Sequence, residues 1–410
     1  MSFETATLDS LCELVVDCPH STPKWTDEGI IVLRNQNIKN GVLDLSAPSF
    51  TNEEDYQKRI KRAAPKAGDI VFTREAPMGE VCMIPEGLKC CLGQRQVLLR
   101  PKSDVNGQYL FWALQSPYVQ QQIAWNEGTG STVSNVRIPV LKALNIPRIG
   151  NEDMVAKSLS DIASKMALNT QTNQTLEQMA QAIFKSWFVD FDPVKAKMNG
   201  EQPEGMDAAT ASLFPDKLVE SELGLIPEGW EVCLLNQKSE IKYGKNLPKT
   251  KLLDEGYPVF GGNGVIGYYS SYLYEDEQVL VSCRGAASGK VLRSLPKSFI
   301  TNNSLVIDLS NSVLNINYVE PYLKGCNLEE YTSGSAQPQM TVANMAPVQI
   351  LVPSEDILKS FDEVVKPLKS KIRANERQNL SLAALRDTLL PKLLSGEIEL
   401  GTSEELVEAI

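Results

Sequence analysis

A shortage of histidine and the spacing of the cysteines narrow the chemistry open to this chain. His20 is the only histidine among 410 residues, and the eight cysteines include no CxxC pair. The cysteines also lack the Cys/His spacing of a zinc site. A lone histidine in a proline-flanked segment cannot supply more than one Ser/His/Asp set. We therefore expect reduced thiols in a cytoplasmic protein and little scope for histidine-dependent catalysis.

Long hydrophobic runs are also missing, and the balance of charge is acidic. No stretch reaches the roughly 18 apolar residues of a membrane-spanning helix, so we expect no membrane partner. The start of the chain lacks a basic segment followed by an apolar run, which speaks against secretion. The net charge of −11 argues against a protein that coats nucleic acid alone. Residues 1–150 nevertheless carry 16 basic and 16 acidic side chains, so clustered bases there remain able to bind nucleic acid.

What the sequence does contain is an internal repeat. Apolar residues spaced by three and four positions run from Val155 to Trp187 and predict a long helix. Adding 206 to each position gives a second apolar series, from Phe361 to Leu393. The matched pairs are Val155/Phe361, Leu159/Val365, Ile162/Leu368, Met166/Ile372, Leu176/Leu382, Met179/Leu385, Ile183/Leu389 and Trp187/Leu393. Pro367 and Pro391 are expected to kink or end the second helix locally, because each removes a helix N–H.

Two asparagines lie near the middle of each series. If the helices pack antiparallel, Asn169 faces Asn379 and Asn173 faces Asn375. Buried amides that pair in only one register fix that register at some cost in stability. The alternative is that these side chains point to solvent on a slightly rotated face.

The regions before the two helices repeat as well, with insertions. Arg74 matches Arg284 at an offset of 210, and Gln94 matches Asn302 at an offset of 208. The first region holds about 17 extra residues, which include the stretch 58–62 (KRIKR) with four basic side chains. Short strands are expected at 29–33, 69–73, 80–84, 96–99 and 143–147, and a helix at 109–125.

These patterns predict an α+β fold with two similar domains of twisted β-sheet and helices. Two long antiparallel coiled-coil helices are expected to separate the domains in a pseudo-twofold internal repeat. The predicted parts are a first domain at 1–150, a helix at 151–192, a linker at 193–225, a second domain at 226–353, a helix at 354–395 and a tail at 396–410.

Two segments imitate catalytic motifs without completing them. Residues 284–290 (RGAASGK) resemble a phosphate-binding loop, but the first glycine is missing and Val291 stands where Ser or Thr would hold magnesium. Pro215-Asp216 with residues 240–242 imitates the carboxylate signature of a nuclease, but Pro215 lies in the predicted linker. The sequence therefore predicts no catalytic residue and no metal site.

Two different domains on a rigid spacer fit the recognition of two unlike DNA half-sites. A helix of about 33 residues is roughly 50 Å long, which exceeds one turn of B-DNA, about 34–36 Å. Base reading needs Arg, Lys, Asn and Gln in turns. The candidates are Arg34, Asn35, Asn37, Lys58, Arg59, Lys61, Arg62, Arg74, Gln94, Arg95, Gln96, Ser131 and Thr132 in the first domain, and Lys245, Lys249, Lys251, Arg284, Asn302 and Asn303 in the second. Each residue taken alone is more typical of a solvated turn than of a base contact. The prediction rests on Arg74/Arg284 and Gln94/Asn302 recurring at matching points.

The whole plan resembles the specificity (S) subunit of a type I restriction–modification system. Three local stretches are similar to that family: residues 185–193 (KSWFVDFDP), 221–230 (SELGLIPEGW) and 389–398 (LLPKLLSGEI). The resemblance implies a non-catalytic chain whose domains are target-recognition domains for double-stranded DNA.

The resemblance also implies partners and their cofactors. Two methyltransferase subunits would use S-adenosylmethionine to methylate adenine, one in each half-site. Two restriction subunits would translocate and cut DNA with ATP and Mg²⁺. This chain would bind no cofactor itself, and its acidic helical middle would be the docking platform.

Two other interpretations remain open from the sequence. One keeps the recognition role but joins this chain to a fused methyltransferase–nuclease. The other is a protein–protein scaffold whose paired helices are the functional surface, without DNA recognition.

Overall fold

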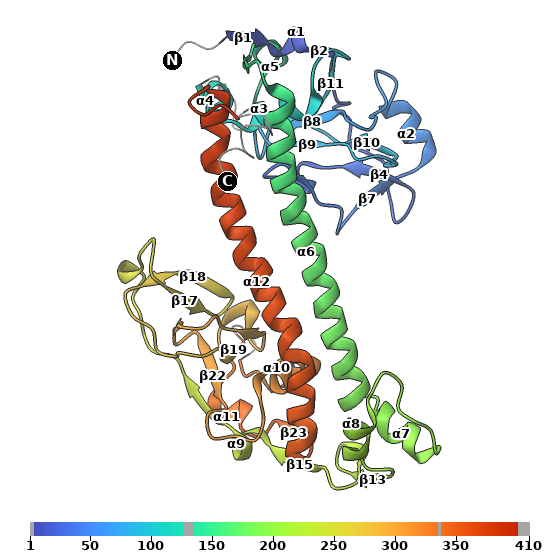
Figure 1. Cartoon of the computed structure of the whole chain (residues 1–410), viewed down its shortest axis with the longest axis vertical. Helices are drawn as coiled ribbons and strands as arrows, with labels where there is room; N and C mark the ends of the chain where they lie inside the picture. Colours follow the sequence, from blue (N-terminus) through green and yellow to red (C-terminus); the bar gives the residue numbers. More distant parts are fainter. Residues whose placement is uncertain (1–3, 126–134, 335–337, 401–410) are drawn as a thin grey trace, which may run out of the picture. The chain divides into compact units, whose positions relative to one another are not determined.

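The two long helices belong to two compact units. A computed structural model describes residues 4–125, 135–334 and 338–400. Unit 1 comprises Met1–Asn169 and Glu376–Ile410, and unit 2 comprises Thr170–Asn375. The helices α6 (Glu152–Phe188) and α12 (Glu355–Leu394) each contribute one half to each unit (Figure 1).

The domain of unit 1 is built on two four-stranded sheets. The first is antiparallel, in the order β2-β11-β8-β9, and the second has the order β10-β4-β7-β3 with β10 parallel to β4. The strands are β1 (Glu4–Thr7), β2 (Cys12–Asp17), β3 (Trp25–Thr26), β4 (Ile30–Leu33), β5 (Ile38–Lys39), β6 (Val42–Leu43), β7 (Ser49–Thr51), β8 (Ile70–Thr73), β9 (Val81–Met83), β10 (Cys90–Leu92), β11 (Gln96–Pro101) and β12 (Asn145–Arg148). The helices are α1 (Leu8–Leu11), η1 (Asn35–Asn37), α2 (Glu53–Arg59), α3 (Gly107–Gln115), α4 (Pro117–Trp125) and α5 (Ile138–Lys142).

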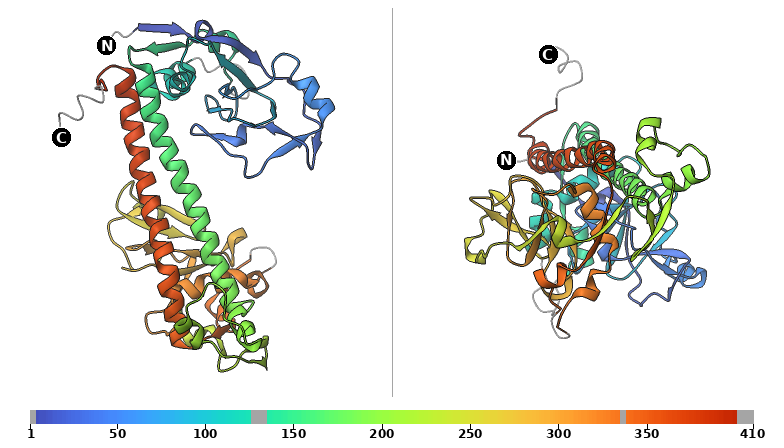
Figure 2. Two further views of the ribbon diagram at one scale, coloured as in Figure 1. Left: turned by 45° about the vertical axis from the view of Figure 1, so that its right-hand side comes forward. Right: turned by 90° about the horizontal axis from the view of Figure 1, so that it is seen from below.

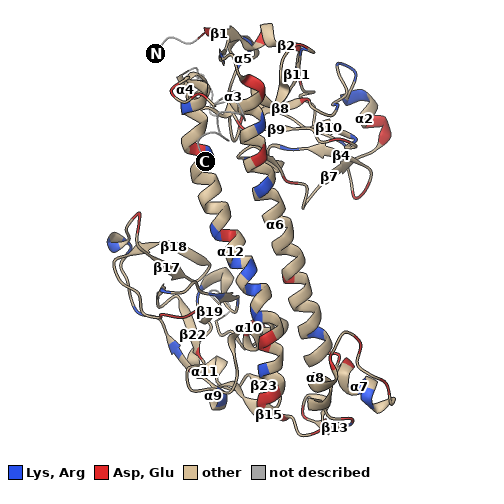
Figure 3. Cartoon of the chain, in the orientation of Figure 1, with Lys and Arg blue, Asp and Glu red and all other residues tan. Residues whose placement is uncertain are grey.

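The helix α2 lies in the segment that the second domain lacks. Its first turn is acidic and its last turn is basic (Figure 3), which favours the helix because the charges oppose the helix dipole. The side chain of Asn52 caps it by accepting the N–H of Asp55 at 2.9 Å.

The domain of unit 2 repeats this plan. Its antiparallel sheet has the order β16-β22-β19-β20, and a second sheet has the order β18-β17-β21 with β17 parallel to β21. The strands are β13 (Leu218–Ser221), β14 (Gly224–Pro227), β15 (Glu231–Leu234), β16 (Glu240–Tyr243), β17 (Tyr257–Gly261), β18 (Gly264–Tyr269), β19 (Val279–Ser282), β20 (Val291–Arg293), β21 (Phe299–Ile300), β22 (Ser304–Asp308) and β23 (Gln349–Val352). The helices are α7 (Asp192–Met198), α8 (Ala208–Leu213), α9 (Leu235–Lys238), η2 (Lys249–Lys251), η3 (Gly285–Ala287), α10 (Ile316–Gly325), η4 (Leu328–Tyr331) and α11 (Val342–Met345). The predicted α+β class with two repeated domains is confirmed.

Each domain packs against the helix halves of its own unit. In unit 1, Val155 and Leu159 of α6 and Leu393 of α12 are buried in the same core as the first sheet. In unit 2, Trp187 and Phe361 contact each other with ring centroids 5.7 Å apart, inside the core of the second domain. The helices are therefore structural parts of both domain cores.

Within each unit the two helix halves run antiparallel, side by side (Figure 2). In unit 1, Asn169 Nδ2 donates to Asn379 Oδ1 at 2.8 Å and also to Gln378 Oε1. In unit 2, Asn375 Nδ2 donates to Asn173 Oδ1 at 2.8 Å. Asn169 and Asn375 are only 2% and 3% exposed, so their amides point inward.

Two predicted inward positions are wrong. Met179 and Leu385 are each 46% exposed, while the next residue, Ala180, is 5% exposed. A helix advances 3.6 residues per turn, so a strict count of three and four drifts around the helix, and the small Ala180 occupies the inward place.

The helical boundaries differ from expectation at prolines. The predicted helix at 109–125 is two helices, because Ser116 before Pro117 adopts an extended conformation with ψ 147°. Conversely, α12 does not end at Pro367 or Pro391. Val365 and Leu393 pack in the cores beside these prolines and hold the helix across each lost hydrogen bond.

The segment predicted as a linker at 193–225 contains α7, α8, β13 and part of β14. Val194 and Phe214 are buried in the core of unit 2. Much of this segment is thus part of the second domain.

Candidate nucleic-acid interface

Four connections meet at one end of the sheets in unit 1. They are residues 18–20 after β2, 34–37 after β4, 74–79 after β8 and 93–95 before β11; together we call them the unit 1 loop cluster. The N–H of Arg74 donates to the carbonyl of Arg95 at 2.8 Å, and Gln94 Nε2 donates to the carbonyl of His20 at 2.7 Å. The side chain of Asn35 donates to the carbonyl of Glu75. These bonds draw polar side chains from distant parts of the chain into one surface.

Four predicted DNA-contact residues of unit 1 are instead used inside the protein. Arg74 Nη1 donates to both carboxylate oxygens of Asp17 at 2.9 Å, and its Nε donates to the carbonyl of Val136. Asn37 is buried and bridges the N–H of Arg34 and the carbonyl of Asp44. The side chains of Arg74 and Asn37 therefore have few hydrogen-bonding groups free to contact a base.

Arg59 and Gln96 are the other two internal residues. The guanidinium of Arg59 is buried, pairs with Asp55 at 2.8 Å and donates to the carbonyls of Ser21 and Leu92. Gln96 is fully buried and accepts the N–H of Gly93. Both residues were predicted to lie in exposed turns. In the structure, the packing of the domain around α2 and β11 buries them.

The remaining candidates of unit 1 lie at or near the surface. The guanidinium carbon of Arg34 lies 5.4 Å from the ring centroid of Trp25. The side chain of Arg95 forms an ion pair with Glu75. Lys58 pairs with Glu54 one helical turn away. Gln94 and Asn35 are half-buried, and Lys61 and Arg62 are exposed. Ser131 and Thr132 lie outside the described residues.

Unit 2 has a loop cluster at the equivalent end of its sheets. It comprises residues 244–246 after β16, 261–264 at the β17–β18 turn, 283–290 after β19 and 301–303 before β22. The N–H of Asn302 donates to the carbonyl of Lys245 at 3.2 Å, and the N–H of Cys283 donates to the carbonyl of Asn303 at 2.9 Å. Burial raises the pKa of Cys283 to about 11, so this thiol stays neutral within the cluster.

The candidates of unit 2 are more open than those of unit 1. Lys245, Lys249, Lys251 and Arg284 are exposed, and Asn302 and Asn303 are half-buried. Among the residues that the structure describes, no side chain pairs with the guanidinium of Arg284. Lys249 and Lys251 lie on η2, away from the bonds that join the loop cluster.

The predicted match of Arg74 with Arg284 is wrong by one residue. Strand pairing sets Thr73 opposite Gln96 and Ser282 opposite Ser304. With Gln96 and Ser304 equivalent, Thr73 corresponds to Ser282, and the counterpart of Arg74 is therefore Cys283. The turn after β19 is one residue longer than the turn after β8. At Gly79 and Gly289, equivalent residues are therefore 210 positions apart. The register of the strand hydrogen bonds decides which residues are equivalent, and sequence similarity alone does not reveal that register.

Sequence reasoning missed several residues of the two clusters. Glu75 and Asp17 supply the carboxylates of unit 1 that bind Arg95 and Arg74. In unit 2, Lys290 Nζ donates to Asn263 Oδ1 at 2.7 Å and joins two turns of the cluster. In the sequence, Lys290 is notable only as the last residue of an incomplete phosphate-loop motif. Glu75 has no distinguishing feature except its position next to Arg74.

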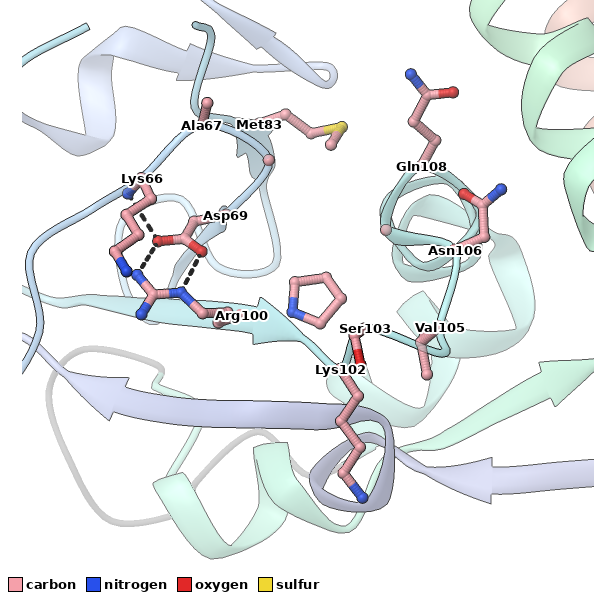
Figure 4. A pocket seen from close by; sticks show the side chains of 13 residues that line it. Lys66, Ala67, Asp69, Met83, Arg100, Lys102, Ser103, Val105, Asn106 and Gln108 are labelled. Atoms are coloured by element: carbon pink, nitrogen blue, oxygen red, sulfur yellow. Dashed lines mark hydrogen bonds and ion pairs between the residues drawn. The ribbon is translucent and has the colours of Figure 1, made fainter. Parts of the chain in front are cut away.

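A cavity of about 550 Å³ in unit 1 is lined by residues that do not belong to the loop cluster. Figure 4 shows the side chains that line it. On its wall Asp69 pairs with Arg100 at 2.7 Å, and the N–H of Lys66 donates to Asp69 at 2.8 Å. Arg100 donates to both carboxylate oxygens of Asp69, and these hydrogen bonds raise the pKa of Arg100. The charges of Asp69 and Arg100 are thus satisfied by each other.

Within residues 4–125, 135–334 and 338–400, no group of three or more metal-binding side chains is found. The same residues contain no helix with the length and apolar character needed to cross a bilayer.

The fold thus defines a protein of two related domains, each of which presents its own cluster of polar loops. Comparison with known proteins gives the family. The sequence model of the type I restriction modification DNA specificity domain matches residues 2–178 and 227–382. These two matches span most of the chain, and the chain belongs to that family.

Relatives in two organisms carry the same description. The chain is 28% identical to the type I restriction enzyme HindI specificity subunit of Haemophilus influenzae, over 85% of this chain and 90% of that protein. It is 27% identical to the MjaIX specificity subunit of Methanocaldococcus jannaschii, over 82% and 79% of the two chains. The crystal structure of a type I S subunit from M. genitalium shares the fold, with a TM-score of 0.60, 18% identity and 96% of both chains covered.

Proposed function

We propose that this chain recognises an asymmetric, bipartite target in double-stranded DNA on behalf of a type I restriction–modification complex. The observation that carries the proposal is the pair of loop clusters, placed at equivalent ends of two repeated domains but lined by different side chains. Two domains that share a fold but differ in the side chains of their loop clusters are suited to bind two half-sites of different sequence. Membership of the DNA specificity family supports the same role.

The long helices are proposed to be the spacer that sets the gap between the half-sites. They form a coiled coil in a pseudo-twofold repeat, whose register the two asparagine pairs select. The 37 residues of α6 give a length of about 55 Å, beyond one turn of B-DNA at about 34–36 Å. Such a spacer leaves unread base pairs between two read segments.

The chain is proposed to be a non-catalytic subunit of a complex that works on DNA in the cytoplasm. Two methyltransferase subunits and two restriction subunits are its proposed partners, and they bind S-adenosylmethionine, ATP and Mg²⁺. The acidic stretch of α6 and the following segment, with 12 acidic and 6 basic residues at 151–225, supports docking of protein there, since DNA would be repelled.

Methylation mapping tests the proposal directly. The chain is co-expressed with its cognate methyltransferase subunit in a host free of DNA methylation, and modified adenines are mapped across the genome. One split motif with two unlike halves and a fixed gap is the expected result. No new methylation from a soluble, associated pair of proteins would contradict the proposal, and failure to associate would favour a scaffold.

A further inference from the structure

The backbone of Arg95 is held in a conformation that arginine rarely adopts. Its φ of 66° lies in the left-handed region, which costs a residue with a side chain about 1 kcal/mol or more. The carbonyl of Arg95 accepts the N–H of Arg74, and this bond fixes the turn inside the unit 1 loop cluster. Glycine fits such a turn more easily, so the presence of arginine points to a use for its side chain.

The guanidinium of Arg95 is oriented by one carboxylate and otherwise open. Nη1 of Arg95 pairs with Glu75, whose side chain is 17% exposed while that of Arg95 is 53% exposed. Glu75 is in turn held through its carbonyl, which accepts the side-chain amide of Asn35. No other partner of the guanidinium lies among the residues described. A fork of N–H donors therefore faces outward with one edge anchored.

The neighbouring charge decides between the two parts of DNA that such a fork could bind. A phosphate beside Arg95 would also lie beside the carboxylate of Glu75, and the two negative charges would repel each other. A guanine edge in the major groove offers two acceptors, O6 and N7, without a formal charge, and arginine binds this pair in a bidentate manner.

We propose that Arg95 reads a guanine in the half-site bound by unit 1, and that Glu75 is its positioning residue. The inference rests on the proposed function, because it assigns a base to one side of a DNA-recognition surface. The side-chain amide of Asn35 donates to the carbonyl of Glu75 and holds its backbone, while the side-chain oxygen of Asn35 is buried without a hydrogen-bond partner.

Arg95→Gly is the sharpest test, because glycine accepts the left-handed backbone and removes only the side chain. The variant is expressed with the methyltransferase subunit, and methylated sites are mapped as for the wild type. We expect one guanine position to accept other bases, with a loss of discrimination of about 10- to 100-fold. Lys102→Ala, an exposed lysine of the same domain outside the loop cluster, is the control and should leave the motif unchanged.

Glu75→Gln tests the positioning role separately. It should relax the same position as Arg95→Gly, and the double variant should relax it no further, because both changes act on one contact. Binding of the complex to non-specific DNA should be equal or stronger, since a negative charge is removed.

Three outcomes would overturn the inference. They are an unchanged motif in Arg95→Gly, relaxation only in the half-site that depends on Arg284, and relaxation by Glu75→Gln at a different position. A wild-type complex that methylates no split motif would instead refute the proposed function, so the two failures are distinguishable.

Discussion

Arg284 and Arg74 carry the same side chain in different surroundings. The guanidinium of Arg284 is exposed, whereas that of Arg74 is locked to Asp17 and to the carbonyl of Val136. We predict that Arg284→Ala relaxes recognition of one half-site only, by roughly 1–3 kcal/mol if Arg284 makes a bidentate base contact. Methylation mapping or competition binding with the assembled complex measures this change. Equal loss at both half-sites would show that the variant disturbs folding instead.

The neighbours Lys58 and Arg59 should separate surface charge from internal charge. Arg59→Ala leaves Asp55 without its main partner and should lower the free energy of unfolding by about 3 kcal/mol. Lys58→Ala removes an exposed pair with Glu54 and should change stability little. Denaturant unfolding of both variants provides the comparison. Similar losses of stability in the two variants would mean that the buried pair of Arg59 with Asp55 does not stabilise the domain.

At the scale of elements, an ion pair joins α6 to α12 within unit 2. Glu177 accepts from Lys369 at 2.6 Å. Burial raises the pKa of Glu177, but the hydrogen bond and charge of Lys369 outweigh burial, and the pKa lies below its ordinary 4.5. The stabilisation is therefore complete above the pKa of the unfolded chain and is lost as pH falls through the lower folded-state pKa.

Glu177→Gln should accordingly destabilise the protein at neutral pH and much less in acid. The difference in free energy of unfolding between wild type and variant is expected to shrink as pH falls below about 4.5. Glu363→Gln, which removes an exposed carboxylate from α12, is the matched control for the loss of one negative charge. A difference that stays constant with pH would assign the effect of Glu177 to packing.

The length of the paired helices offers a second test at this scale. Four residues inserted after Gln171 in α6 and four after Arg377 in α12 fall between the asparagines of each helix, so both amide pairs are retained. The spacer lengthens by about 6 Å, close to two base pairs. Methylation mapping should show the same two half-sites with a wider gap. An unchanged gap would mean that the helices do not set the spacing.

For the whole molecule, the charge of −11 predicts that DNA binding depends on partners. Alone, the chain should bind DNA weakly at physiological salt, since phosphate contacts dominate affinity and the net negative charge of the chain repels phosphate. Gel-shift titrations with and without the methyltransferase subunits measure the difference. Nanomolar, sequence-specific binding by the isolated chain would contradict this prediction.

The sequence predicted the large elements better than the contact surface, and the reason is physical. Helix periodicity and repeated strands leave regular patterns, and the two asparagine pairs stand out because amides are unusual in an apolar series. The enclosure of Arg59, Asn37 and Gln96 depends on tertiary closure, which leaves no local pattern. The one-residue shift between Arg74 and Arg284 depends on strand register, which similar neighbouring sequences conceal.

The sharing of α12 between the two units has a consequence for synthesis on the ribosome. Most of unit 1 precedes unit 2 in the sequence, but Leu390, Leu393 and Leu394 of its core follow unit 2. The ribosome must therefore synthesise all of unit 2 before the core of unit 1 can close. A product that stops short of α12 lacks these three leucines, so part of the apolar core of unit 1 stays open to solvent.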